Sequence, residues 1–166
     1  ANYSHSGLKK ELFFNINNFE KFKKKIIYLV VEDEPKNVIF NHNNEISILR
    51  YNSICRINHQ RDFIKNSLKY FSPEDFIMHS DNDEIPNLEK IDFKSLSKNI
   101  IIFNQKLFYY KLNLFLPNVE WFGTKGCTVK NLEDFTWLRN IKNKTYKSYR
   151  LDTLFSKTKY IKTKII

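Results

Sequence analysis

The sequence predicts an α/β fold, because short β-rich apolar runs alternate with segments of helical periodicity. Two of these runs lead directly into acidic loops, which is typical of strands that end beside a ligand in a parallel-type sheet. The chain has 166 residues, the length of one domain, so we expect a single domain over 1–166.

The first predicted strand is the continuous apolar run 26–31, which ends in the acidic loop 32–34. A helix is predicted over about 58–70, since its apolar residues fall on one helical face. Pro73 marks the turn that follows this helix.

A second short strand is predicted over 75–80, and we expect it to lie beside 26–31 in one sheet. A short helix over 87–96 and a third strand over 100–103 follow. The stretch 107–116 alternates aromatic residues with lysine and asparagine, which indicates an antiparallel strand with one wet face.

Composition excludes several classes of protein. Hydrophobic residues make up 42% of the chain, enough to form a core, and no apolar run is long enough to span a bilayer. Cys55 and Cys127 are too few for a disulfide framework or a four-thiolate zinc site, so we interpret both as ordinary reduced thiols. The four histidines show no zinc-site spacing.

The formal net charge of +10 would normally favour a nucleic acid or an acidic membrane as partner. Lys, Asn and Ile, whose codons are AT-rich, account for 62 of the 166 residues, so we attribute much of this charge to genome bias. The dense lysine cluster at 21–25 is interpreted as a solvated helix end or as a contact for an anion or a membrane surface. Because the chain begins at Ala1 and stops on the apolar Ile166, we expect an internal fragment of a longer protein.

The most informative segment is the acidic turn at 81–84, in which Asp81, Asp83 and Glu84 supply three carboxylates. Such crowding of negative charge is unfavourable unless a cation lies there, and Mn²⁺ or Mg²⁺ prefers oxygen ligands of this kind. An EF-hand is excluded, because an isoleucine and a proline stand where that loop needs a ligand and a glycine. The alternative is a surface acidic turn without a metal.

The run SDNDEIP at 80–86 resembles a characteristic segment of the family 17 glycosyltransferases, the family of β-1,4-mannosyl-glycoprotein 4-β-N-acetylglucosaminyltransferase. Five further segments are similar to that family in the same order along the chain. They are SHSGLKKELFF at 4–14, KIIYLVVEDEP at 25–35, NHQRDFI at 58–64, FYYKLNL at 108–114 and WFGT at 121–124.

The resemblance implies a GT-A-like nucleotide-sugar-binding sheet with flanking helices, incomplete at both ends. It also implies an inverting glycosyltransferase that uses Mn²⁺ or Mg²⁺ and moves N-acetylglucosamine from UDP-N-acetylglucosamine to a glycan acceptor. A eukaryotic member would reside at the Golgi membrane, and a microbial or viral one would be cytoplasmic or membrane-associated. The implied partners are a nucleotide sugar and a glycan, with no nucleic acid expected.

On this resemblance the catalytic residues are Asp81, Asp83 and Glu84. Asp83 is the first choice of metal ligand, and Asp81 is the second, on the metal or on the ribose. Glu84 would orient the donor or lie behind the metal ligands and support them. The alternatives are a backbone-capping turn residue for Asp81 and a solvated carboxylate for Glu84.

Four residues are expected to bind the donor. Gln60 and Arg61 would lie in the first turn of the 58–70 helix, where free N–H groups and the helix dipole favour phosphate, and Arg61 would contact either the diphosphate or the acidic loop at 81–84. Lys10, beside Gly7, would reach the diphosphate. The alternatives are a surface ion pair for the arginine and a solvated lysine.

Trp121 and Gly123 are expected in a loop after the aromatic strand, as a stacking platform for the acceptor sugar, and the alternative is a core tryptophan. Two other functions stay open. One is a metal-dependent nucleotidyltransferase, which would need a third acidic ligand from a distant strand. The other is a basic nucleic-acid-binding module, with salt-sensitive binding.

Overall fold

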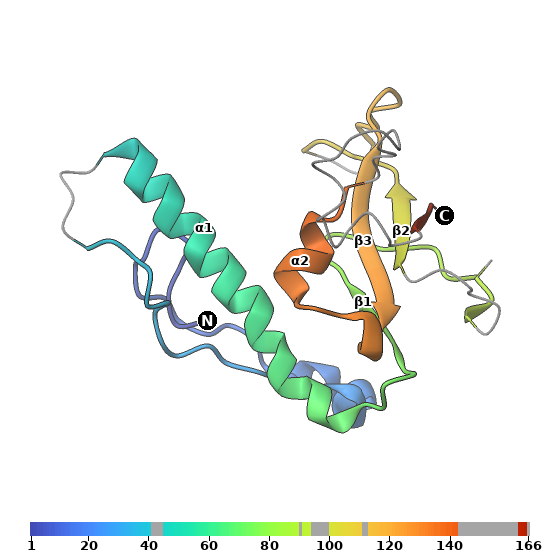
Figure 1. Cartoon of the computed structure of the whole chain (residues 1–166), viewed down its shortest axis with the longest axis horizontal. Helices are drawn as coiled ribbons and strands as arrows, with labels where there is room; N and C mark the ends of the chain where they lie inside the picture. Colours follow the sequence, from blue (N-terminus) through green and yellow to red (C-terminus); the bar gives the residue numbers. More distant parts are fainter. Residues whose placement is uncertain (41–44, 90, 94–99, 111–112, 143–162, 166) are drawn as a thin grey trace, which may run out of the picture. The chain divides into compact units, whose positions relative to one another are not determined.

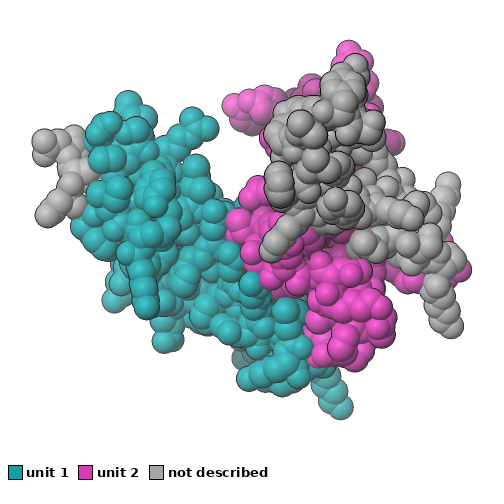
Figure 2. Space-filling model, viewed as in Figure 1, with its two compact units in different colours: residues 1–70 teal, residues 71–166 magenta. Residues whose placement is uncertain are grey.

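The structure is a computed structural model that describes residues 1–40, 45–89, 91–93, 100–110, 113–142 and 163–165. The chain forms two compact units, residues 1–70 and residues 71–166 (Figure 2). Within the described ranges, no helix combines the length and the apolar character that crossing a membrane requires. The expectation of one domain over 1–166 stays a prediction.

The first unit is built around the helix α1, Ile46–Asp62, with the 3₁₀ segments η1, Ile16–Lys25, and η2, Phe63–Tyr70. Asn52 is buried on α1 and ties the helix to the chain that precedes it. Its side-chain amide accepts a hydrogen bond from Ile39 N (2.9 Å) and donates one to Ile39 O (2.8 Å). The buried amide is thereby satisfied, as buried polar groups in folded proteins generally are.

The predicted helix start is wrong. The helix was expected from 58, but α1 begins at Ile46 and continues as η2 to Tyr70. The early part of α1 leaves apolar residues such as Ile46 (82% exposed) and Ile54 (48% exposed) in contact with solvent. Because this part lacks one sorted apolar face, the periodicity that reveals most helices is missing.

The predicted strand at 26–31 is also wrong. These residues form no strand, and Ile27 and Tyr28 are 46% and 45% exposed. A strand needs a neighbouring strand to satisfy its backbone groups. In the described part of the first unit, the strand-like pairing is limited to an isolated bridge between Tyr3 and Lys9.

The second unit contains a small sheet in the order β1-β3-β2-β4 (Figure 1). Its strands are β1, Phe76–His79; β2, Ile100–Gln105; β3, Trp121–Thr128; and β4, Thr163–Ile165. The pairs β1–β3 and β2–β3 are antiparallel, and β2–β4 is parallel.

The strands predicted at 75–80 and 100–103 are therefore confirmed as β1 and β2. The expected pairing of 75–80 with 26–31 is wrong, because the neighbour of β1 is β3. The sheet is mainly antiparallel rather than of the parallel type. A chain that mixes helices with a small sheet is compatible with the predicted α/β class.

The core of the second unit joins the sheet to the helix α2, Phe135–Asn140. Ile100 and Cys127 from the sheet pack with Leu138 from α2, and all three have no exposed surface. Burying each large aliphatic side chain stabilises a fold by about 1.5–3 kcal/mol. Burial also raises the pKa of the Cys127 thiol to about 12, and Cys55 is a buried free thiol too, as predicted.

Three connecting segments differ from the prediction. The stretch 107–116 is not one strand: its described residues 107–110 and 113–116 pair with each other as the two sides of a hairpin, and 111–112 lie outside the described ranges. In the expected helix over 87–96, residues 87–89, 91 and 92 are not helical, Phe93 lies in a 3₁₀ segment, and residues 90 and 94–96 are not described. Trp121 and Gly123 lie in β3, not in a loop.

Candidate functional site

The acidic turn, residues 81–84, follows β1 and closes on itself through two hydrogen bonds. Glu84 N donates to Asp81 O (3.0 Å), and Asp81 N donates to the Glu84 side chain at Oε2 (3.0 Å). This reciprocal pairing buries Glu84, whose side chain is 4% exposed, and leaves Asp83 exposed. The turn therefore presents one carboxylate to solvent and fixes another inside the fold.

Arg139, near the end of α2, neutralises the buried part of the turn. Its guanidinium makes a two-pronged contact with Glu84, in which Nη1 donates to Oε2 and Nη2 donates to Oε1, both at 2.7 Å. Nη2 also donates to Asp81 Oδ2 and Nη1 to Gly123 O, again at 2.7 Å. Two-pronged pairs between arginine and carboxylate are among the stronger hydrogen-bonded contacts in proteins.

Trp121 completes the surroundings of Glu84. Its indole Nε1 donates to Glu84 Oε1 (3.0 Å), while its ring stays 39% exposed. The interpretation as a core tryptophan is therefore wrong, because the residue is bonded through its N–H and remains half exposed. Glu84 accepts hydrogen bonds from three residues, so it is also not the solvated carboxylate that was weighed as an alternative.

Glu84 and Arg139 shift each other's pKa values in the directions expected for an ion pair. Burial would raise the pKa of Glu84, but hydrogen bonds from Arg139, from the Asp81 backbone and from Trp121 outweigh it, and the pKa lies below its ordinary value. The hydrogen bond to Glu84 raises the pKa of Arg139 in turn. Glu84 is therefore held as an anion by its partners despite its burial.

The lowered pKa of Glu84 predicts an acid-sensitive contribution to stability. A carboxyl group of this kind stabilises the fold fully above its unfolded pKa of about 4.3, and the contribution is lost as the pH falls through the lower folded pKa. We expect Glu84→Gln to flatten the dependence of the free energy of unfolding on pH below about 4.3. Urea denaturation of both proteins across that range measures the slopes, and equal slopes would contradict the assignment.

Two residues of β3, Gly123 and Lys125, support the cluster that Arg139 forms with the acidic turn. A Cβ on Gly123 would lie 2.7 Å from Glu84 Cδ and would also clash with the side chain of Gln105, so glycine leaves the room that the buried carboxylate occupies. Lys125 is buried, and its ammonium donates to Ile141 O (2.6 Å) and to Arg139 O. It therefore holds the end of the helix that carries Arg139, where carbonyl groups lack helical partners.

The structure thus brings together Asp81, Glu84, Trp121 and Gly123 around Arg139, with Asp83 exposed in the same turn. The predicted donor-binding residues all lie in the first unit. They are Gly7, Lys10, Gln60 and Arg61.

The reason given for a phosphate contact at Gln60 and Arg61 is wrong. Both lie near the C-terminal end of α1, not in its first turn. The dipole is negative and the unsatisfied backbone groups are carbonyls at that end of a helix, which disfavours phosphate.

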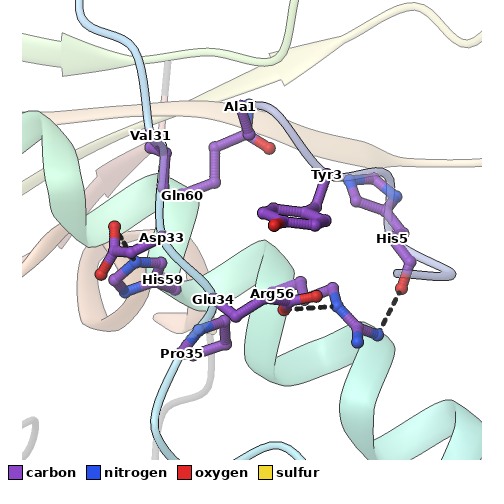
Figure 3. A pocket seen from close by; sticks show the side chains of 10 residues that line it. All are labelled: Ala1, Tyr3, His5, Val31, Asp33, Glu34, Pro35, Arg56, His59 and Gln60. Atoms are coloured by element: carbon purple, nitrogen blue, oxygen red, sulfur yellow. Dashed lines mark hydrogen bonds and ion pairs between the residues drawn. The ribbon is translucent and has the colours of Figure 1, made fainter. Parts of the chain in front are cut away.

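Gln60 lines a small hollow in the first unit together with Ala1 and Tyr3 (Figure 3). An ion pair from Arg56 Nε to Glu34 Oε2 (2.8 Å) and a hydrogen bond between His59 Nε2 and Asp33 Oδ1 (3.3 Å) border the hollow (Figure 3). The hydrogen bond from His59 lowers the pKa of Asp33. The space left is little larger than a water molecule, so the hollow does not fit a nucleotide.

Gly7 and Lys10 lie near the start of the first unit. Gly7 has a φ of +87° in the turn that Arg56 packs against, and a Cβ there would lie 2.7 Å from Arg56 Cζ. Arg56 Nη1 donates to His5 O (3.2 Å). Gly7 is therefore explained by the approach of this guanidinium, while Lys10 is exposed.

Sequence reasoning missed Arg139 and Arg56. A signal for both was present, because the chain has only five arginines beside 23 lysines. Where composition favours lysine so strongly, an arginine indicates a position that needs the planar, two-pronged guanidinium. Arg139 and Arg56 each hold a carboxylate with a side chain that is 12% exposed.

Among the described residues, no group of three or more His, Cys, Asp or Glu side chains is placed to hold a metal ion. Comparison of the chain with protein-family models, with curated proteins and with solved structures finds no match.

Proposed function

We propose that this chain is part of a metal-dependent inverting glycosyltransferase that moves N-acetylglucosamine from UDP-N-acetylglucosamine to a glycan acceptor. The resemblance of SDNDEIP to the family 17 glycosyltransferases supports the proposal. The single observation that carries it is the construction of the acidic turn. Arg139 and Trp121 hold Glu84 inside the fold, and the turn that results presents Asp83 to solvent.

The charges of the turn favour a cation together with an anionic donor. Three carboxylates against the guanidinium of Arg139 and the buried ammonium of Lys125 still leave the cluster negative, so a diphosphate would be repelled. A divalent cation removes that repulsion and, when bound, neutralises the leaving diphosphate.

The residues present fit a metal ion that is held jointly with the donor. Asp83 and Asp81 offer carboxylate oxygens, whereas Glu84 is committed to Arg139 and Trp121. No larger set of acidic, histidine or cysteine ligands gathers within the described ranges. Mg²⁺ in particular is commonly bound by one or two carboxylates plus substrate phosphates and water.

The chain's own residues then have distinct roles. Asp83 supplies the anionic oxygen nearest to solvent, and Asp81 shares its charge with Arg139. Arg139 holds the turn in shape, but its single positive charge does not neutralise the three carboxylates. Gly123 has no side chain and so leaves the space in which Glu84 is buried. The half-exposed Trp121 remains the proposed contact for the acceptor sugar.

The proposal predicts that UDP binds only when a divalent cation is present. In titration calorimetry of the chain we expect heat with UDP and Mn²⁺, and none with UDP and excess chelator. Equal binding in both conditions would exclude a metal-mediated site, and absence of binding in both would overturn the proposal. Tight binding of UTP but not of UDP-N-acetylglucosamine would favour a nucleotidyltransferase instead, and steeply salt-dependent binding of nucleic acid would favour the basic module.

A further inference from the structure

The hairpin 107–116 presents two tyrosine rings to solvent in the second unit. Tyr109 and Tyr110 are 58% and 87% exposed, and their rings meet nearly at right angles, with centroids 4.5 Å apart and an interplanar angle of 76°. Ring contacts and backbone hydrogen bonds join the two sides of the hairpin at its base. Phe108 and Phe115 form a bridge with ring centroids 5.6 Å apart, and Leu116 N donates to Leu107 O (2.9 Å).

Tyr110 adopts a backbone conformation that is uncommon for a bulky residue. Tyr110 has a φ of 61°, in the left-handed region. Glycine or asparagine adopts that region easily, whereas a bulky side chain there is strained. Strained backbone of this kind clusters at binding and active sites, so the strained and exposed tyrosine motivates a functional hypothesis.

The hairpin leaves the sheet at the end where the acidic turn lies. β2 ends at Gln105 and β3 begins at Trp121, and these two residues are paired across the sheet. Trp121 in turn donates to Glu84. In Figure 1 the connection between β2 and β3 extends beyond this end of the sheet. The two tyrosines therefore belong to the connection that begins and ends beside the candidate site.

We propose that Tyr109 and Tyr110 form a stacking site for a pyranose ring of the acceptor glycan. This inference rests on the proposed function and assigns its acceptor contact to residues beyond Trp121. A pyranose has an apolar C–H face and a polar rim, which match an aromatic face and a phenol hydroxyl. A fully covered aromatic side chain buries about 150–250 Å², so two tyrosines suit a small ligand and offer far less than the roughly 1,600 Å² of a stable protein interface.

Saturation-transfer NMR on the chain, with methyl β-D-mannopyranoside and methyl β-N-acetylglucosaminide as probes, tests the site. We expect transfer to the ring C–H protons of at least one probe, and about tenfold weaker binding in Tyr110→Gly, as for the loss of a strong aromatic contact. Because glycine relieves the positive φ, the thermal midpoint of that variant should be unchanged or higher. Tyr70→Ser removes a similarly exposed tyrosine (63%) outside the hairpin and should leave the sugar signal intact.

The remaining outcomes separate this inference from the proposed function. Sugar binding without metal-dependent UDP binding would support the stacking site and refute the transferase. Metal-dependent UDP binding with no transfer to either sugar, or with equal transfer in Tyr110→Gly, would overturn the stacking site alone. A signal from a single-stranded oligonucleotide that disappears in Tyr110→Gly, with no sugar signal, would also overturn it in favour of a nucleic-acid contact.

Discussion

Replacing Arg139 with methionine is expected to lower the free energy of unfolding by about 3–5 kcal/mol, the usual effect of removing one partner of a buried ion pair. The variant leaves the Glu84 carboxylate buried without its two-pronged contact, and it frees the negative charge of Asp81. Urea denaturation at neutral pH measures the loss. The loss should shrink at mildly acid pH, because an uncompensated buried carboxylate takes up a proton more readily.

Two comparisons make this prediction specific. Lys130→Met removes an exposed ion pair with Glu74, whose side chains are 50% and 72% exposed, and should change stability by less than about 1 kcal/mol. Glu84→Gln in the Arg139→Met background removes the unpaired charge and should recover part of the loss. Equal effects of Arg139→Met and Lys130→Met would show that the guanidinium does not hold the turn.

Replacing Asp83 with alanine is expected to abolish the Mn²⁺-dependent binding of UDP, while Asp83→Asn weakens it by a smaller factor. A hard cation needs an anionic oxygen, and an amide oxygen replaces it only in part. Because Asp83 is exposed, Asp83→Ala should leave the free energy of unfolding within about 0.5 kcal/mol of the wild-type value. Titration calorimetry with metal present and urea denaturation measure the two effects separately.

Asn82→Ala is the matched control, since Asn82 is exposed in the same turn and carries no charge. It should keep both the stability and the metal-dependent affinity. Unchanged UDP affinity in Asp83→Ala would remove this residue from the metal site. Loss of affinity in Asn82→Ala as well would show that the backbone of the turn, and not the carboxylate, was being measured.

Local sequence patterns predicted the strands whose surroundings agree with them. β1 and β2 are apolar runs, and Ile100–Phe103 of β2 is buried throughout, as a continuous run predicts. The equally apolar run at 26–31 failed, because a strand also requires a partner that no local pattern reveals. β3 was missed for the opposite reason, since its buried stretch consists of Gly123, Thr124, Lys125, Gly126 and Cys127, which does not resemble a strand.

The candidate site could be predicted in part for the same physical reason. Asp81, Asp83 and Glu84 are adjacent in sequence, so the crowding of their charge is visible before any fold is known. Their division into one exposed carboxylate, one shared carboxylate and one buried carboxylate depends on Arg139. That arginine comes from a helix that no spacing connects to the turn.

The long separation between Arg139 and the acidic turn has a kinetic consequence. The guanidinium is 55 residues from Glu84 and 58 from Asp81 along the chain, so this contact closes a large loop and adds to the contact order. We expect the contacts of Arg139 with the acidic turn to be absent from the folding transition state and to form only after α2 docks on the sheet. Loss of Arg139 should then accelerate unfolding and leave the folding rate nearly unchanged. The contacts of Arg139 with Glu84 and Asp81 would therefore set the lifetime of the native state and not the rate at which it forms.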